Sequence, residues 1–166
     1  QTCALPISIM GGDPDHPWAQ TRESILAMKE LWSKEQSEFH GKYYDFPPVR
    51  SFPKPAQQSH PPVLLGGAAK RVFERIVAWG DGWLPTSLPV AEIARGRAVL
   101  NDLAARAGRD AQSIAIYAFG QAGQYRTRAA IEELEQAGVD HVTVWLSAEG
   151  EGKLREVEQL ATVLFR

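Results

Sequence analysis

Short apolar runs alternate with longer segments of helical periodicity over most of the chain. The apolar runs, which predict strands, are residues 63–65, 82–84, 113–119 and 142–146. After each run, apolar residues at spacings of three and four predict a helix, over residues 69–79, 89–107, 127–137 and 153–164. Four strand–helix units in succession predict parallel strands joined by right-handed crossovers, with both sheet faces covered because the strands are nearly continuously apolar. The expected fold class is therefore α/β.

The preceding part of the chain has a different pattern. Apolar residues recur at helical spacing among charged ones over residues 22–32, which predicts an amphipathic helix. The stretch at about 39–62 then carries six prolines. Because proline fixes φ and has no backbone N–H, this stretch is expected to form neither helix nor central strand but a long surface excursion. Its aromatic residues indicate that the excursion packs down.

Composition narrows the classes of function. The 166 residues are 44% hydrophobic, enough for one core, and the 18 basic and 20 acidic residues are interleaved along the chain. A net charge of -2 without a basic block makes nucleic acid an unexpected partner. No apolar stretch approaches the roughly 20 residues that cross a bilayer, so no membrane is expected and the default compartment is the cytosol. The single cysteine excludes an intramolecular disulfide, and the histidines show no ligand spacing, so no metal is expected.

The first seven residues, QTCALPI, match the translation of a common sequencing-library adaptor, CAG ACG TGT GCT CTT CCG ATC. We therefore expect residues 1–7 not to be part of the natural protein, and residues 8–166 to be a fragment of a longer one. A natural N-terminus that has the same seven residues is the alternative. The single cysteine, Cys3, belongs to this heptapeptide.

The clearest candidate for ligand chemistry is the pair Gly66 and Gly67, between an expected buried strand and an expected helix. Glycines let a ligand reach the backbone, and the first N–H groups of a helix lack intrahelical acceptors at the positive end of its dipole. This arrangement suits a phosphate, to which Lys70 and Arg71 could add charge. A purely structural turn is the alternative, and neither GxxxxGK[ST] nor GxGxxG is present.

Three motifs in order favour the ligand interpretation: FHGKYYDF at 39–46, FPKPAQQSHPPVLLGG at 52–67 and AWGDGWLP at 78–85. With these motifs the chain, from about Thr21 onward, resembles the luciferase-like monooxygenase family, most closely its branch of oxidoreductases that use the deazaflavin coenzyme F420. That family folds as a (β/α)8 barrel with a Pro-rich excursion before the fifth strand. The resemblance implies a partial TIM (β/α)8 barrel, about the last four βα units.

The resemblance also implies a cofactor site. In similar proteins the cofactor phosphate lies on the glycine turn after the fifth strand, which here comprises Gly66, Gly67, Ala68 and Ala69. The general barrel rule places phosphate after strands 7 and 8, so the family departs from it. Amide donors at a helix start act on an anion in the same way at either place.

The loop after the sixth strand is expected to lie at the same end of the barrel as the glycine turn. This end, where the carboxyl ends of the strands meet, is termed the rim below. In sugar-phosphate-oxidising relatives the threonine that matches Thr86 contacts substrate, so Thr86 and Ser87 are the candidate substrate contacts. Capping of the helix that begins at Pro89 is the alternative role for these hydroxyls.

Other residues have structural interpretations. Asp81 is expected to orient backbone in the DGW turn, and His141 to lie at the N-terminal end of the last strand, away from the cofactor. Trp83 and Trp145, both placed within strands, are expected to fill the core. Arg126 follows the seventh strand at the same rim. It could contact an acidic cofactor tail there, and a position in a solvated loop is the alternative.

The function implied is hydride transfer between F420 and a small organic substrate by the full-length protein, with an FMN-dependent monooxygenase as the alternative. The family's first four strands have no counterpart here, so the catalytic residues are unknown and are expected in a missing N-terminal half. The fragment is then expected to be inactive alone, and its uncovered inner face and sheet edges favour a homo-oligomer or a companion half-barrel. A non-catalytic half-barrel that binds a phosphorylated ligand is the alternative from another class.

Overall fold

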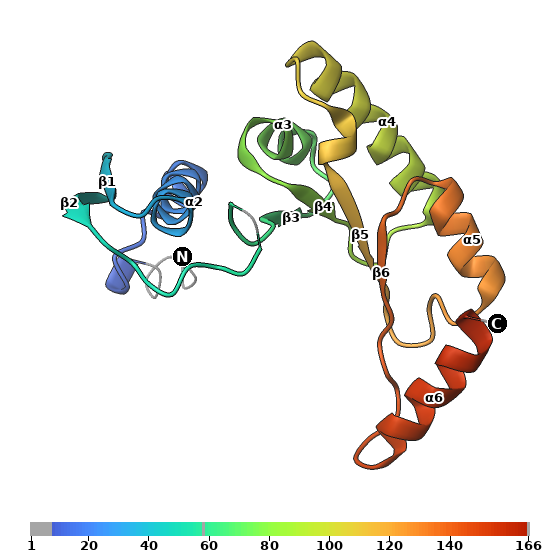
Figure 1. The fold of residues 1–166 in the computed structure, drawn as a ribbon. Coiled ribbons are helices and arrows are strands. Elements are labelled where there is room, and N and C mark those ends of the chain that lie inside the picture. The colour runs from blue at the N-terminus through green and yellow to red at the C-terminus, as the bar shows by residue number, and fades with distance from the viewer. Residues whose placement is uncertain (1–7, 58, 166) are drawn as a thin grey trace. The chain divides into compact units, whose positions relative to one another are not determined.

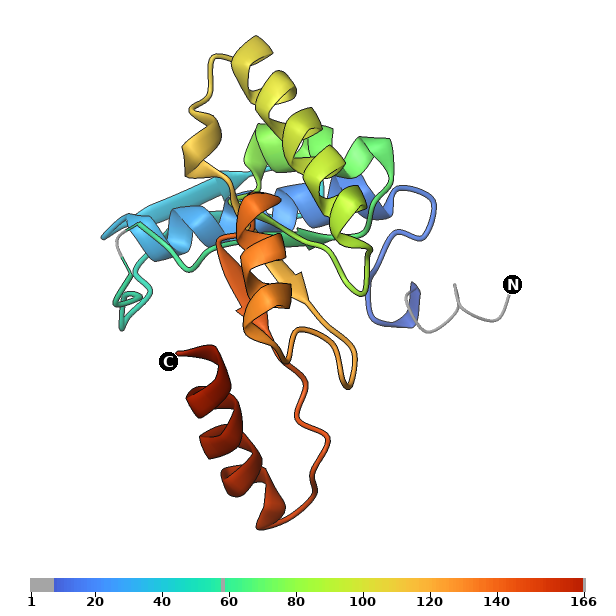
Figure 2. The same cartoon turned by 90° about the vertical axis from the view of Figure 1, so that its right-hand side faces the viewer.

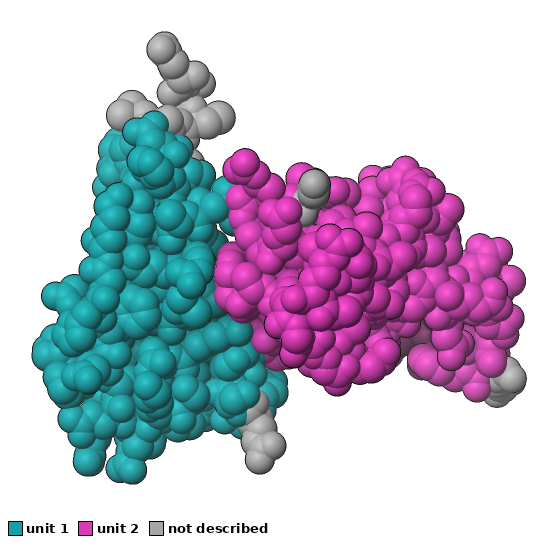
Figure 3. Space-filling model, turned by 90° about the horizontal axis from the view of Figure 1, so that it is seen from above, with its two compact units in different colours: residues 1–61 teal, residues 62–166 magenta. Residues whose placement is uncertain are grey.

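The structure, a computed structural model, describes residues 8–57 and 59–165 (Figure 1). It divides into two compact units, Gln1–Pro61 and Pro62–Arg166, coloured separately in Figure 3. The prediction that residues 1–7 derive from an adaptor lies outside the described residues.

Unit 1 contains a long helix and a β-hairpin. Helix α2 spans Pro17–Ser33 and starts with a proline, at a position where the missing N–H would have no intrahelical acceptor. Strands β1, Ser37–His40, and β2, Asp45–Val49, pair antiparallel. The Glu23 carboxylate of α2 accepts hydrogen bonds from the N–H groups of the two residues before β2, at 2.5 and 2.8 Å. This contact ties the hairpin turn to the helix.

The hairpin refines the interpretation of residues 39–62 as an irregular excursion. Pro47 and Pro48 lie within β2, which is possible because each strand of a two-stranded sheet is an edge strand with one unpaired side. Phe39 and Phe46 stack across the hairpin with ring centroids 6.2 Å apart, so part of the expected aromatic packing is present. Phe52 remains 62% exposed.

Unit 2 alternates strands and helices as the apolar pattern predicted. Its strands are β3 Leu64–Gly66, β4 Gly82–Leu84, β5 Ala115–Phe119 and β6 His141–Thr143, and its helices are α3 Lys70–Trp79, α4 Val90–Arg106, α5 Arg128–Gln136 and α6 Gly152–Leu164. The strands form one parallel sheet in the order β3-β4-β5-β6. Sequential βα units around a parallel sheet confirm the α/β class and match part of a (β/α)8 barrel.

Two strand boundaries differ from the predicted ones. A 3-10 turn, η1, occupies Ala111–Ser113, so β5 begins at Ala115 and not at residue 113. Strand β6 ends at Thr143, and Trp145, expected to be core within that strand, lies beyond it and is 53% exposed. The backbone beyond β6 leaves the sheet because it donates hydrogen bonds to the Glu156 carboxylate of α6.

Helices α3, α4 and α5 cover one face of the sheet of unit 2, as right-handed crossovers between neighbouring strands require. Figure 2 looks onto α4 and α5 in front of the strands, with α6 below the sheet. Strand side chains alternate between the two faces. On the helix-covered face, Leu65, Trp83, Ile116 and Ala118 are each at most 5% exposed. Together with helix residues that include Ile76, Ile93, Leu100 and Leu134, they form the core.

The opposite face, termed the open face below, is only half buried within unit 2. Its residues include Gly66 beside Leu84, and Tyr117 beside His141, at matching heights in the parallel register. In a closed barrel the corresponding face points to the interior. The apolar strands predicted that both faces of the sheet would be covered. Within this unit only one face is.

Candidate functional site

The glycine turn joins the carboxyl end of β3 to helix α3. Gly66 is the last residue of β3 and pairs with Leu84, and a Cβ atom built on Gly66 would meet only the Leu84 carbonyl oxygen, at 3.7 Å. Gly67 has φ +92°, a left-handed conformation that favours glycine. Residues 66–69 are all exposed. The predicted turn is therefore present, with its backbone accessible from outside.

Helix α3 starts without a side-chain cap. Its N-cap residue, Ala69, has an extended backbone and a side chain that cannot accept a hydrogen bond. The Ala69 carbonyl accepts from the N–H of Val72 at 2.8 Å, which tightens the first turn. The earlier N–H groups stay at the positive end of the helix dipole, which is the arrangement that binds anions.

Thr86 and Ser87 follow β4 at the same edge of the sheet. Thr86 is exposed and forms an isolated parallel bridge with Phe119. Ser87 has φ +58°, donates its N–H to the Phe119 carbonyl at 2.9 Å, and has a buried hydroxyl without a partner among the described residues. Helix α4 has Pro89 as its N-cap and no side-chain cap, so the capping alternative for these hydroxyls is wrong.

The parallel register brings these predicted residues together. Because β3 and β4 are neighbours, the glycine turn and the Thr86–Ser87 loop both lie at the carboxyl ends of adjacent strands. Phe119, at the end of β5, has the ring of Trp145 beside it, with centroids 5.9 Å apart and an edge-to-face angle of 87°. The rim therefore combines accessible amides, two hydroxyls and an aromatic pair.

Sequence reasoning missed a charged pair behind this rim. Arg126, in the loop after β5, forms an ion pair with Glu156 of α6, and the Glu156 side chain is only 8% exposed. Glu156 also accepts hydrogen bonds from the N–H groups of Ser147 at 3.0 Å and Ala148 at 2.7 Å. These two backbone bonds, with the Arg126 guanidinium, lower the pKa of the Glu156 carboxyl from 4.5 to about 2. The sequence had left two positions open for Arg126, a contact with an acidic cofactor tail and a solvated loop. In the structure its guanidinium instead pairs with a carboxylate of the protein.

Replacing Glu156 with glutamine is expected to make the protein less stable at pH 7 and less sensitive to acid. Since the folded pKa of about 2 lies below the unfolded value near 4.5, the carboxylate stabilises the fold above about pH 4.5, and this contribution is lost as the pH falls toward 2. Urea unfolding at pH values from 7 to 2 should show the wild-type and Glu156→Gln curves converging at the acid end. Glu158→Gln, an exposed change on the same helix, controls for the loss of one negative charge. Parallel wild-type and Glu156→Gln curves would contradict the assignment.

Tyr125 is a second buried polar residue next to the rim. It has φ +58°, is 8% exposed, and its hydroxyl has no partner among the described residues. Burial raises the pKa of the Tyr125 phenol. A Cβ atom on Gly120 would lie 2.6 Å from the Tyr125 ring, so glycine at position 120 makes room for it.

The remaining candidates have structural positions. The Asp81 carboxylate accepts a hydrogen bond from the Val63 N–H at 2.8 Å, which agrees with its predicted role in orienting backbone. The His141 ring stacks on Tyr117 with centroids 4.2 Å apart, at the first residue of β6. The described part of the chain contains no cluster of His, Cys, Asp and Glu that could hold a metal ion. No helix in that part is long and apolar enough to span a membrane.

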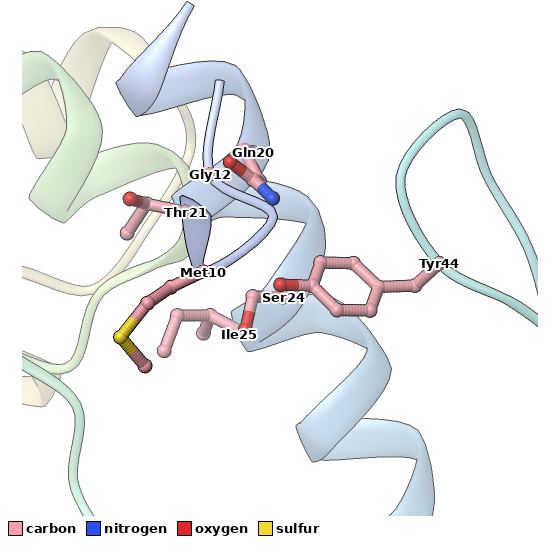
Figure 4. A pocket seen from close by; sticks show the side chains of 7 residues that line it. All are labelled: Met10, Gly12, Gln20, Thr21, Ser24, Ile25 and Tyr44. Atoms are coloured by element: carbon pink, nitrogen blue, oxygen red, sulfur yellow. The ribbon is translucent and has the colours of Figure 1, made fainter. Parts of the chain in front are cut away.

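A cavity of about 510 Å³ lies in unit 1, beside α2. Its lining includes Gln20, Thr21, Ser24 and Ile25, and Figure 4 shows Tyr44 pointing from its loop toward α2. None of its seven lining residues is charged, so the cavity offers no carboxylate or imidazole for acid–base chemistry. It is not part of the predicted site.

Comparison with known protein families identifies one that covers most of the sequence. The model of the family described as luciferase-like monooxygenase matches residues 6–162. An uncharacterised protein of Mycobacterium tuberculosis is 37% identical over 101 residues, which make up 60% of this chain and 35% of that protein. The FMNH2-dependent dimethylsulfone monooxygenase of Pseudomonas putida is 26% identical over 102 residues, 61% of this chain and 27% of that enzyme. The chain thus spans about a third or less of the length of these curated relatives.

Solved structures share the fold at low sequence identity. The monooxygenase RslO1 from Streptomyces bottropensis superposes with a TM-score of 0.74 at 16% identity, covering 96% of this chain and 64% of that one. The coenzyme F420 dependent tetrahydromethanopterin reductase from Methanopyrus kandleri gives a TM-score of 0.64 at 15% identity, covering 86% and 60%. Both matches cover part of a longer chain, which agrees with a partial barrel.

Proposed function

The chain belongs to the luciferase-like monooxygenase family, and we propose that it is the C-terminal part of an oxidoreductase that transfers a hydride between coenzyme F420 and a small organic substrate. The observation that carries this proposal is the exposed Gly66–Gly67 turn at the start of α3, at the rim that also carries Thr86 and Ser87. A binding role for this turn agrees with the two cofactors, F420 and FMNH2, that relatives name.

The residues present fit the phosphate end of such a cofactor. Gly66 leaves open space where a side chain would stand, and the helix start supplies N–H donors without a competing side-chain cap. Amide donors at the positive end of a helix dipole suit a phosphate of either cofactor. FMN therefore remains the alternative cofactor, since the turn recognises what F420 and FMN share.

Each rim residue has a distinct role in the proposal. When bound, the cofactor supplies the ring that exchanges the hydride with substrate. The amides of residues 67–69 bind and orient its phosphate, and Thr86 and Ser87 hydrogen-bond the substrate. The buried Ser87 hydroxyl lacks a partner among the described residues, which costs free energy until a ligand or water bonds to it. Phe119 and Trp145 help to exclude water from the same rim.

Replacing Gly66 with alanine is expected to weaken FMN binding about 10-fold while leaving riboflavin binding unchanged, because a methyl group would occupy the space next to the phosphate donors. The two ligands differ only by the phosphate, so their comparison isolates the contact. Titration of the ¹⁵N-labelled chain, followed through the backbone amide resonances of residues 66–69, measures both affinities even when binding is weak. F420 and its phosphate-free deazaflavin core provide the parallel pair.

Gly66→Ala should keep the wild-type melting temperature, since the added Cβ meets nothing closer than 3.7 Å. A loss of FMN affinity in a stable variant would therefore report on the ligand. If wild-type protein binds each ligand and its phosphate-free partner equally, the turn is not a phosphate site and the proposal fails.

A further inference from the structure

Trp83 reaches from the core to the glycine turn. Its side chain is on the helix-covered face of the sheet and is 1% exposed. The indole Nε1–H nevertheless donates a hydrogen bond to the Gly67 carbonyl oxygen, at 2.6 Å. The carbonyl of the turn is therefore drawn toward the layer of helices.

This hydrogen bond sets the direction of a neighbouring amide. In a trans peptide, the carbonyl oxygen and the following N–H lie in one plane and point in opposite directions. Because the Gly67 carbonyl points into the helix layer, the Ala68 N–H points away from it, toward the exposed side of the turn. Among the described residues, no group accepts a hydrogen bond from the Ala68 N–H.

The indole is itself held in place by two helices. Phe73 of α3 packs edge-to-face on it, with centroids 5.0 Å apart. A Cβ atom on Gly96 of α4 would lie 2.3 Å from the Trp83 ring, so glycine at this position allows the ring to lie directly on the helix backbone. The ring also borders a cavity of about 310 Å³, which Phe73 and Gly96 line as well. The hydrogen bond to Gly67 adds a directional contact to this packing. A fixed donor of this kind preorganises the turn that it holds.

We propose that Trp83 is a positioning residue for phosphate binding: its indole N–H holds the Gly67 carbonyl so that the Ala68 amide is aimed at the cofactor phosphate. The inference rests on the proposed function, because it assumes that the phosphate lies on this turn. From its packing alone, Trp83 would be described only as a core residue.

Trp83→Phe tests this role because phenylalanine keeps an aromatic ring in the core and lacks the N–H donor. We expect the preference for FMN over riboflavin to fall about 3- to 10-fold, the range for one hydrogen bond, through weaker FMN binding alone. The Ala68 amide resonance should also shift less on addition of FMN than in wild-type protein. Trp79→Phe, a change at another buried tryptophan at the far end of α3, is the matched control and should retain the wild-type preference.

A measurement on wild-type protein covers the case in which Trp83→Phe does not fold. The indole N–H resonance of Trp83 should shift on addition of FMN and stay unchanged with riboflavin, because phosphate on the Ala68 amide polarises the Gly67–Ala68 peptide that the indole contacts. An unshifted indole resonance, or a Trp83→Phe variant with the full FMN preference, would overturn the inference while leaving the phosphate site intact. Equal binding of FMN and riboflavin by wild-type protein would instead overturn the proposed function and the inference with it.

Discussion

Replacing Gly82 with alanine is expected to lower the free energy of unfolding by about 3 kcal/mol, the upper part of the range for overpacking a core. Gly82 begins β4, and a Cβ atom there would lie 2.5 Å from the Ala115 carbonyl oxygen and 2.7 Å from the Leu64 side chain. The first contact is with backbone of the neighbouring strand, which cannot rotate away, so β4 and β5 must separate. Since β4 leads directly to Thr86, the same separation should displace the rim.

Urea unfolding followed by circular dichroism measures this effect. Gly66→Ala is the matched control because it adds the same methyl group to the same open face of the adjacent strand, where the nearest atom is 3.7 Å away. Its stability should stay within about 0.5 kcal/mol of wild type. If the two alanine variants are equally stable, the close strand spacing at Gly82 does not limit the fold.

Replacing Arg97 with methionine should cost about 2–4 kcal/mol of stability, because it removes several charge-assisted hydrogen bonds at once. The guanidinium on α4 donates to the Gly138 carbonyl at 2.6 and 3.0 Å and to the Ile114 carbonyl at 2.8 Å. It also donates to Asp140 at 2.6 Å, whose carboxylate accepts the Ile116 N–H at 2.7 Å. The side chain thus connects α4 to the starts of both β5 and β6.

The control for this variant is Arg95→Met, two residues earlier on the same helix. Arg95 is 69% exposed and its contact is with Glu92 at 3.6 Å, so its replacement should change stability by less than about 0.5 kcal/mol. Hydrogen exchange gives a second measurement, since the Ile116 amide should exchange faster in Arg97→Met. A variant with wild-type stability and wild-type protection at Ile116 would show that the connection is not needed.

The sequence was sufficient for the fold class and for the location of the glycine turn, because both depend on local patterns. Apolar runs with a change of period from strand to helix predict βα units wherever they occur, and the structure confirms four of them in a parallel sheet. The turn at Gly66 and Gly67 followed from two glycines between a strand and a helix. The boundaries were less certain: β5 began two residues late because residues 111–113 form a 3-10 turn held by local hydrogen bonds.

The sequence left the roles of individual polar and aromatic residues open. Trp145 was expected in the core but lies beyond β6 and is 53% exposed, because hydrogen bonds to a glutamate 11 residues later draw the loop away from the sheet. Arg126 could have faced a ligand or solvent, and its pairing with Glu156 depends on a helix 30 positions further along the chain. Charge alone carries no signal for a partner at that distance.

By itself, then, the sequence determined the succession of βα units and the bare backbone turn, since local spacing and the absence of side chains are visible in the chain. Only the tertiary structure decided what orients that turn. The indole of Trp83 and the carbonyl of Gly67 are 16 residues apart and meet because β3 and β4 are paired in parallel. Direction in space, which a donor or acceptor needs, arises from such pairings between distant segments.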